Sequence, residues 1–172
     1  STAPMMRAST SATTNLLGNP GFESGATTWV QSGSVISNST SQPARTGTWK
    51  ADLNGFGYVS TESFYQTVTI PATVTSAILS FWLHIDTAET TTSTAYDKLS
   101  VQVQNSSGTV LNTLATYSNL NKNTGYDMWA LPLFNGSSAS AITASFWLMI
   151  TSQATVPTTT VLAMAFSNST RA

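Results

Sequence analysis

Hydrophobic and polar residues alternate with a period of two over several stretches of the chain. The clearest run is 79–85, in which leucine, phenylalanine and isoleucine alternate with serine, tryptophan and histidine. Residues 64–70 and 99–103 show the same alternation. This period is typical of half-buried strands, and threonine, valine and isoleucine dominate throughout, with no run that favours a helix. The pattern predicts an all-β fold, a two-sheet antiparallel β-sandwich (jelly roll) of eight to ten strands.

The N-terminal segment differs from the rest of the chain. Residues 1–14 are mostly serine, threonine and alanine, with two methionines and no periodicity. They are interpreted as a linker or an extended N-terminal segment. Residues 15–172 then suit one β-sandwich domain of medium size.

A short sequence occurs twice. Ser-Phe-Trp-Leu-x-Ile stands at 80–85 and again at 145–150, and each copy precedes a threonine-rich loop and a further alternating run. The spacing is too long for a solenoid repeat. We expect two similar long strands in equivalent places of two facing or neighbouring sheets.

Composition narrows the possible partners. The chain has 25 serines and 30 threonines among 172 residues, but only 8% charged residues and a net charge of −1. An ordinary domain has roughly 25% charged residues. Basic residues are too scattered for nucleic acid, no apolar run is long enough for a membrane span, and the absence of cysteine excludes disulfides. We interpret this charge-poor, lysine-poor surface as that of a secreted, extracellular protein.

Several segments carry a resemblance to a known group of modules. Residues 15–25 read Asn-Leu-Leu-Gly-Asn-Pro-Gly-Phe-Glu-Ser-Gly, and Trp29 follows. Further matching segments are 51–55, 66–71, 79–89 and 96–101. Together they resemble a carbohydrate-binding-module-like jelly roll, an accessory domain of secreted bacterial hydrolases that include serine-carboxyl and other peptidases. The resemblance covers about 15–126 and implies a glycan or polysaccharide ligand and a parent hydrolase domain in the same precursor.

The resemblance also implies a metal site. Modules of this kind commonly hold a structural Ca²⁺ with the glutamate of the opening motif, here Glu23, and two adjacent acids near the C-terminus. This chain has Ala163 and Met164 where those acids would stand. Asp86 and Glu89, which begin a threonine-rich loop, are a second candidate because carboxylate oxygens suit Ca²⁺. We expect any such calcium to be structural.

The residues argue against catalysis. His84 is the only imidazole, and Asp86 lies two residues further along the same strand, nearly 7 Å away at ~3.3 Å per residue. That spacing does not suit a triad, and no nucleophile elbow is present. The acid pairs Asp52/Glu62 and Asp86/Glu89 have no recognisable glycosidase context and are interpreted as loop carboxylates. We therefore expect no enzymatic activity.

Aromatic side chains are the strongest candidates for ligand binding. Sugars stack their C–H faces on aromatic rings, while neutral polar groups bond their hydroxyls. Two arrangements are open, a strand face of Trp82, His84 and Tyr65 or a loop cluster at one end. The loop cluster consists of Trp49, Tyr58 and Trp129. Phe22, Phe81 and Phe146 are expected in the core, whereas Phe56 and Tyr126 are further loop aromatics.

The sequence thus favours a non-catalytic, secreted module that binds a carbohydrate or cell-surface glycan. The alternative is a structural subunit of an extracellular filament or surface layer, in which copies assemble by strand donation. In that case the apolar run 161–166 is the expected place for the donated strand. Four glycosylation sequons, at Asn38, Asn105, Asn135 and Asn168, fall in expected loops or ends.

Overall fold

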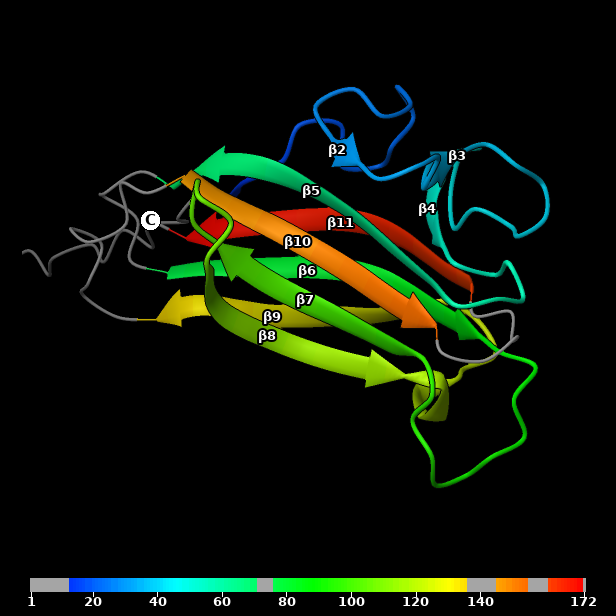
Figure 1. Cartoon of the computed structure of the whole chain (residues 1–172). Coiled ribbons are helices and arrows are strands. Elements are labelled where there is room, and N and C mark those ends of the chain that lie inside the picture. The colour runs from blue at the N-terminus through cyan, green and yellow to red at the C-terminus, as the bar shows by residue number, and fades with distance from the viewer. Residues whose placement is uncertain (1–12, 71–75, 136–144, 155–160, 172) are drawn as a thin grey trace, which may run out of the picture.

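Two antiparallel sheets face each other in the computed structural model of the chain (Figure 1). The structure describes the backbone of residues 13–70, 76–135, 145–154 and 161–171, and side chains between 15 and 133. Sheet A has the order β3-β4-β11-β6-β9, with β1 also on β11, and sheet B has the order β2-β5-β10-β7-β8. The two-sheet all-β sandwich expected from the sequence is confirmed.

The described residues form eleven strands, more than the eight to ten expected, because three of them are two-residue pieces. Sheet A contains β1 (Thr13–Thr14), β3 (Ile36–Ser37), β4 (Lys50–Leu53), β6 (Ser76–Asp86), β9 (Asp127–Asn135) and β11 (Val161–Arg171). Sheet B contains β2 (Val30–Gln31), β5 (Ser60–Thr69), β7 (Lys98–Gln104), β8 (Val110–Ser118) and β10 (Ser145–Ala154). A short 3-10 turn, η1 (Asn119–Asn121), follows β8. No helix in the described part of the chain is long and apolar enough to span a membrane.

The period-two pattern places the core between the sheets. In β6 the residues Leu79, Phe81, Leu83 and Ile85 are buried, as the alternation predicts. Phe22 of the opening segment and Phe64 of β5 are fully buried and pack at 6.0 Å between ring centroids, with Trp29 5.3 Å from Phe22. Phe22 and Phe81 are therefore core residues as expected, while the side chain of Phe146 lies outside the described residues.

The repeated Ser-Phe-Trp-Leu motif occupies equivalent strands. One copy lies in β6, between β11 and β9 of sheet A, and the other lies in β10, between β5 and β7 of sheet B. The register pairs Phe146 with the buried Val68, just as Phe81 faces the core in sheet A. The expectation of two similar strands in facing sheets is confirmed.

The C-terminal strand is paired on both sides over part of its length. β11 pairs with β6 along its whole length and with β4 through Leu162, Ala163 and Met164. The expected acceptor run at 161–166 is thus held on both sides over those three residues, and assembly by strand donation stays a prediction. The donor in that hypothesis is the N-terminal segment 1–14, which lies outside the described residues apart from β1, and β1 pairs with β11 of its own chain.

The pairing of β11 with β6 also corrects the expected location of one glycosylation sequon. Asn168 lies inside β11, opposite the buried Leu79, and not in a loop or at an end of the fold. Directly opposed residues in an antiparallel pair share a face, so Asn168 stands at a core-facing position.

Candidate functional site

The loop between β4 and β5 carries the chain from sheet A to sheet B. Asn54, Gly55 and Gly57 have φ values of +63°, +90° and +71°, and glycine or asparagine tolerates this left-handed region best. The resulting turns hold Phe56 and Tyr58 outward, 49% and 61% exposed. Their rings stack at 5.4 Å with an interplanar angle of 20°. An exposed aromatic pair is thus held on a short, sharply turned loop.

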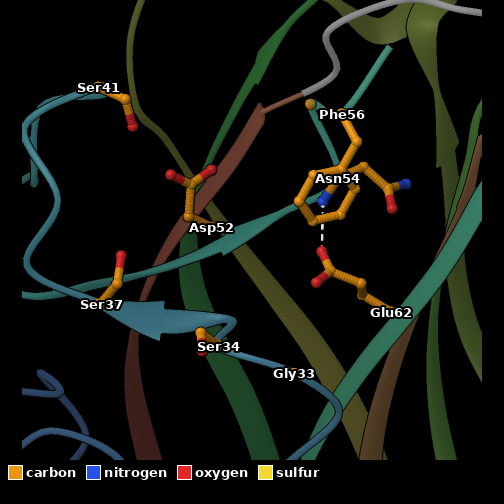
Figure 2. A pocket seen from close by; sticks show the side chains of 9 residues that line it. Gly33, Ser34, Ser37, Ser41, Asp52, Asn54, Phe56 and Glu62 are labelled. Atoms are coloured by element: carbon orange, nitrogen blue, oxygen red, sulfur yellow. Dashed lines mark hydrogen bonds between the residues drawn. The ribbon is translucent and has the colours of Figure 1, made fainter. Parts of the chain in front are cut away.

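A pocket of about 470 Å³ is lined by Phe56 of this aromatic pair. Figure 2 shows the lining side chains. Its wall comes from the β2–β3 connection, the segment after β3, strand β4, the β4–β5 loop and strand β5. The lining residues are Gly33, Ser34, Ser37, Ser41, Asp52, Asn54, Gly55, Phe56 and Glu62. Apart from Phe56 the wall is made of glycines, hydroxyls, one amide and two carboxylates. The pocket therefore combines an aromatic rim with many hydrogen-bonding groups.

The two carboxylates reach the pocket from different sheets. Asp52 lies on β4, and its Oδ2 is 3.8 Å from the Nζ of Lys50. Lys50 is only 1% exposed, and its ammonium also donates a hydrogen bond of 2.6 Å to the carbonyl of Ser39. Burial raises the pKa of Asp52, although the charge and hydrogen bond of Lys50 act in the opposite direction.

Glu62, on β5, is held by a hydrogen bond from the β4–β5 loop. Its Oε2 accepts a hydrogen bond of 2.7 Å from the backbone N–H of Asn54, shown as the dashed line in Figure 2. Burial raises the pKa of Glu62, the bond from Asn54 lowers it, and the nearby charge of Asp52 raises it. Two partly buried carboxylates thus interact across one pocket, each held from its own strand.

This arrangement suits recognition of a polyhydroxylated ligand. Carboxylate and hydroxyl oxygens accept hydrogen bonds from ligand hydroxyls, and an exposed aromatic pair supplies a flat apolar surface. A few placed polar groups beside an aromatic wall are typical of small-molecule sites.

Of the expected end cluster, only Tyr58 lies near this pocket, where it stacks on the lining residue Phe56. Trp49 is partly buried against the core, and a methyl group at Gly25 would lie 3.4 Å from its ring. Trp129 lies on β9, at the opposite edge of sheet A from β4, and packs edge-on against Tyr117 at 5.0 Å. The three expected residues therefore do not form one site.

Trp82 and His84 lie on the outer face of sheet A, where another segment covers them. The guanidinium carbon of Arg45 stands 3.7 Å from the centroid of the Trp82 ring. The ring of His84 lies 5.7 Å from that of Tyr126, whose hydroxyl donates a hydrogen bond of 2.9 Å to the carbonyl of Pro43. Residues 42–45 thus lie over this face, and Trp82 already has a stacking partner.

Tyr65 does not join Trp82 and His84. It lies on β5 of sheet B, whereas the other two lie on β6 of sheet A. The alternation places all three on outer faces, but these are the outer faces of opposite sheets. The expected strand-face cluster was therefore wrong in its grouping, and Tyr65 stays a separate candidate.

The residues expected to bind calcium, Glu23, Asp86 and Glu89, lie in different surroundings. Both carboxylate oxygens of Glu23 accept hydrogen bonds from the backbone N–H of Thr48, and one also accepts from Trp49. Asp86 is exposed and accepts a bond of 3.3 Å from Gln42, whereas Glu89 is buried. In the part of the chain that the structure describes, no three acidic or histidine side chains converge as a metal site would require. Calcium binding stays a prediction, and the described side chains do not assemble a site for it.

The most informative site residues were not among the predicted ligand-binding set. Phe56 was noted only as a loop aromatic, and Asp52 and Glu62 only as an acid pair without a glycosidase context. A usable signal was present in the segment Asn54–Tyr58, where glycines alternate with two aromatics and an acid lies on either side. Glycines keep such a loop tight, so its aromatic residues point away from it.

Comparison with known proteins gives a likeness in fold alone. No family model and no curated protein matches the chain. Among solved structures, the chain is similar to TmCBM61, a module solved in complex with β-1,4-galactotriose. The TM-score is 0.59 at 18% identity, over 90% of this chain and 97% of that one. The chain therefore shares the β-sandwich fold of that module.

Other solved structures share the fold in different settings. The arabinose-bound α-L-arabinofuranosidase MgGH51 matches with a TM-score of 0.56 at 17% identity, over 91% of this chain and 26% of that one. A Stig cyclase, Fisc from Fischerella sp. TAU, matches with a TM-score of 0.55 at 10% identity, over 93% and 98%. The fold therefore occurs in binding modules and enzymes alike, and function has to be argued from the site.

Proposed function

We propose that this chain is a non-catalytic, secreted carbohydrate-binding module that holds a polysaccharide or cell-surface glycan, by aromatic stacking and hydrogen bonds, beside a parent hydrolase. The observation that carries the proposal is the exposed Phe56–Tyr58 stack at a pocket lined by hydroxyls and carboxylates. The stack offers a platform for a sugar ring, and the pocket offers acceptors for its hydroxyls.

The site supports binding better than catalysis. Glycoside hydrolysis needs two carboxyl groups with separate roles, one of which faces the anomeric carbon or its attacking water. Here Asp52 is tied to the buried ammonium of Lys50, and Glu62 is tied to the Asn54 amide. Both are held by the protein itself, as expected of groups that orient a ligand.

Exposure supports the aromatic pair as the main source of affinity. Large apolar side chains that stay in solvent are costly to keep exposed, and a ligand that covers them gains that free energy. Phe56 and Tyr58 are about half or more exposed and already parallel, so binding requires little reordering of the loop.

The test is a binding panel with matched variants. Wild type is titrated with soluble neutral polysaccharides, beginning with β-1,4-galactan, and is mixed with insoluble ones in a pull-down. Phe56→Ala and Tyr58→Ala are each expected to weaken binding about tenfold, which corresponds to ~1.4 kcal/mol. Tyr96→Ala, which removes another exposed tyrosine away from the pocket, is the control and should bind as wild type does.

Two results would overturn the proposal. One is a protein that binds no glycan, neutral or amino-substituted, while circular dichroism shows that it is folded. The other is a loss of affinity in Tyr96→Ala equal to that in Tyr58→Ala, since the pocket would then have no special part in binding.

A further inference from the structure

The pocket has an unbalanced charge. Among its described lining residues, Asp52 and Glu62 are the ionisable ones. Lys50 forms an ion pair with Asp52, so the positive charge of Lys50 is assigned to Asp52. Among the described residues, Glu62 has no cationic partner. Two carboxylates against one ammonium leave a net charge of about −1.

A ligand can reach the charge of Glu62 but not that of Lys50. Lys50 is almost completely buried, whereas Glu62 is only partly buried. The Oε2 of Glu62 accepts the bond from Asn54, and its Oε1 faces Gly33, where an added methyl carbon would lie 3.4 Å away. No described side chain or amide donates to Oε1. The absence of a side chain at position 33 therefore leaves this oxygen open to the pocket.

From this charge and access we infer that the pocket prefers a glycan unit that carries a protonated amino group, and that Glu62 determines this specificity. The inference rests on the proposed function, because it names the sugar class for the same pocket. An ammonium donates three hydrogen bonds and neutralises the remaining charge, whereas an N-acetyl group is uncharged. A uronic acid would bring a second anion toward Glu62 and is disfavoured.

The aromatic rim fits the same ligand. An ammonium near the face of a tyrosine or phenylalanine is attracted by the negative face of the ring. Phe56 lines the pocket and carries Tyr58 stacked on it. The pocket thus places a carboxylate and an aromatic face within one cavity, and both favour a cation over a neutral acetamide.

The experiment compares matched sugars. Oligomers of glucosamine and of galactosamine are titrated calorimetrically against their N-acetylated counterparts of equal length, at a pH where the amine is protonated. Wild type is expected to bind the amino form at least about fivefold more tightly, and added salt should reduce the difference. A uronic acid oligomer of equal length should bind more weakly than either form.

Two variants assign the effect to its residue. Glu62→Gln keeps an oxygen that accepts from Asn54 but removes the charge, so it should lose the amine preference while its affinity for the N-acetylated form stays within about twofold. Asp86→Asn removes an exposed carboxylate outside the pocket and should keep the preference.

The outcomes separate the two proposals. If wild type binds neutral glycans and shows no amine preference, the inference is overturned and the proposed function stands. If it binds neither amino nor neutral glycans, the proposed function fails and the inference with it. A preference that persists in Glu62→Gln overturns the assignment to Glu62.

Discussion

The close approach of Glu23 to Gly47 allows a test of how the opening segment, residues 15–25, is held against the sandwich. Gly47 has a φ of +66°, and a methyl group at this position would meet the carboxylate of Glu23. That carboxylate accepts backbone N–H bonds from Thr48 and Trp49, each between 3.1 and 3.2 Å. Gly47→Ala therefore strains the backbone and also displaces the carboxylate from its donors.

The magnitude follows from two separate costs. A left-handed conformation costs an alanine about 1 kcal/mol or slightly more. Loss of the carboxylate from two backbone donors adds about 1 kcal/mol for each. We expect Gly47→Ala to lower the free energy of unfolding by about 3 kcal/mol, and Glu23→Ala to lower it by about 2 kcal/mol. Gly108→Ala, with a φ of +81° and nothing within 4 Å of its added methyl, should cost only about 1 kcal/mol.

The assay is urea unfolding followed by tryptophan fluorescence, on wild type, the three single variants and the Glu23→Ala/Gly47→Ala double variant. Once Glu23 is removed, the alanine at 47 meets no carboxylate, so the double variant should lose about 3 kcal/mol and not the additive 5. The reasoning is refuted if the two substitutions add without coupling, or if Gly47→Ala costs no more than Gly108→Ala.

Three further predictions concern other parts of the fold. Because burial raises the pKa of Asp52 and Glu62, the folded chain binds more protons than the unfolded chain at pH values between their ordinary and raised pKa values. These groups should therefore add stability as the pH falls from neutral through that window, and thermal unfolding should show a flatter pH profile for Glu62→Gln. Removal of the guanidinium in Arg45→Ala should expose Trp82 and increase acrylamide quenching of its fluorescence, whereas a Trp82→Phe background should show no such increase. In a glycosylating host Asn168 should stay unmodified despite its sequon, since it stands at a core-facing position of β11, and peptide mass mapping would reveal any glycan there.

For the clearly alternating strands β5, β6 and β7, the sequence predicted which side faces the core, but it did not predict which strands share a sheet. Alternation is a local property, so the buried positions of β6 and the outward position of Tyr65 followed from single stretches of sequence. Whether Tyr65 lies near Trp82 depends on strand order, which long-range pairing through β10 and β11 decides. This is why the individual outward positions were predicted correctly while their grouping was wrong.

The candidate pocket was hard to predict for a related reason. Its two carboxylates are ten positions apart in sequence, on strands of different sheets, and a loop of turned glycines brings them to one cavity. Trp82 shows the opposite case, in which a promising aromatic is covered by Arg45 from a segment far away in sequence. Exposure of an aromatic residue depends on such distant segments, and alternation carries no information about them.

Asp52 has two structural roles, so a substitution at Asp52 is a less specific test of the pocket than one at Glu62. It lines the cavity, and it also neutralises Lys50, whose buried ammonium holds the carbonyl of Ser39. Removal of one partner of a buried ion pair leaves the other charge uncompensated and costs about 3 kcal/mol or more. A change at Asp52 would therefore disturb the segment over sheet A together with the pocket. Glu62 has no cationic partner among the described residues. Glu62→Gln therefore changes the charge that a ligand meets and leaves the contacts of Lys50 with Asp52 and Ser39 intact.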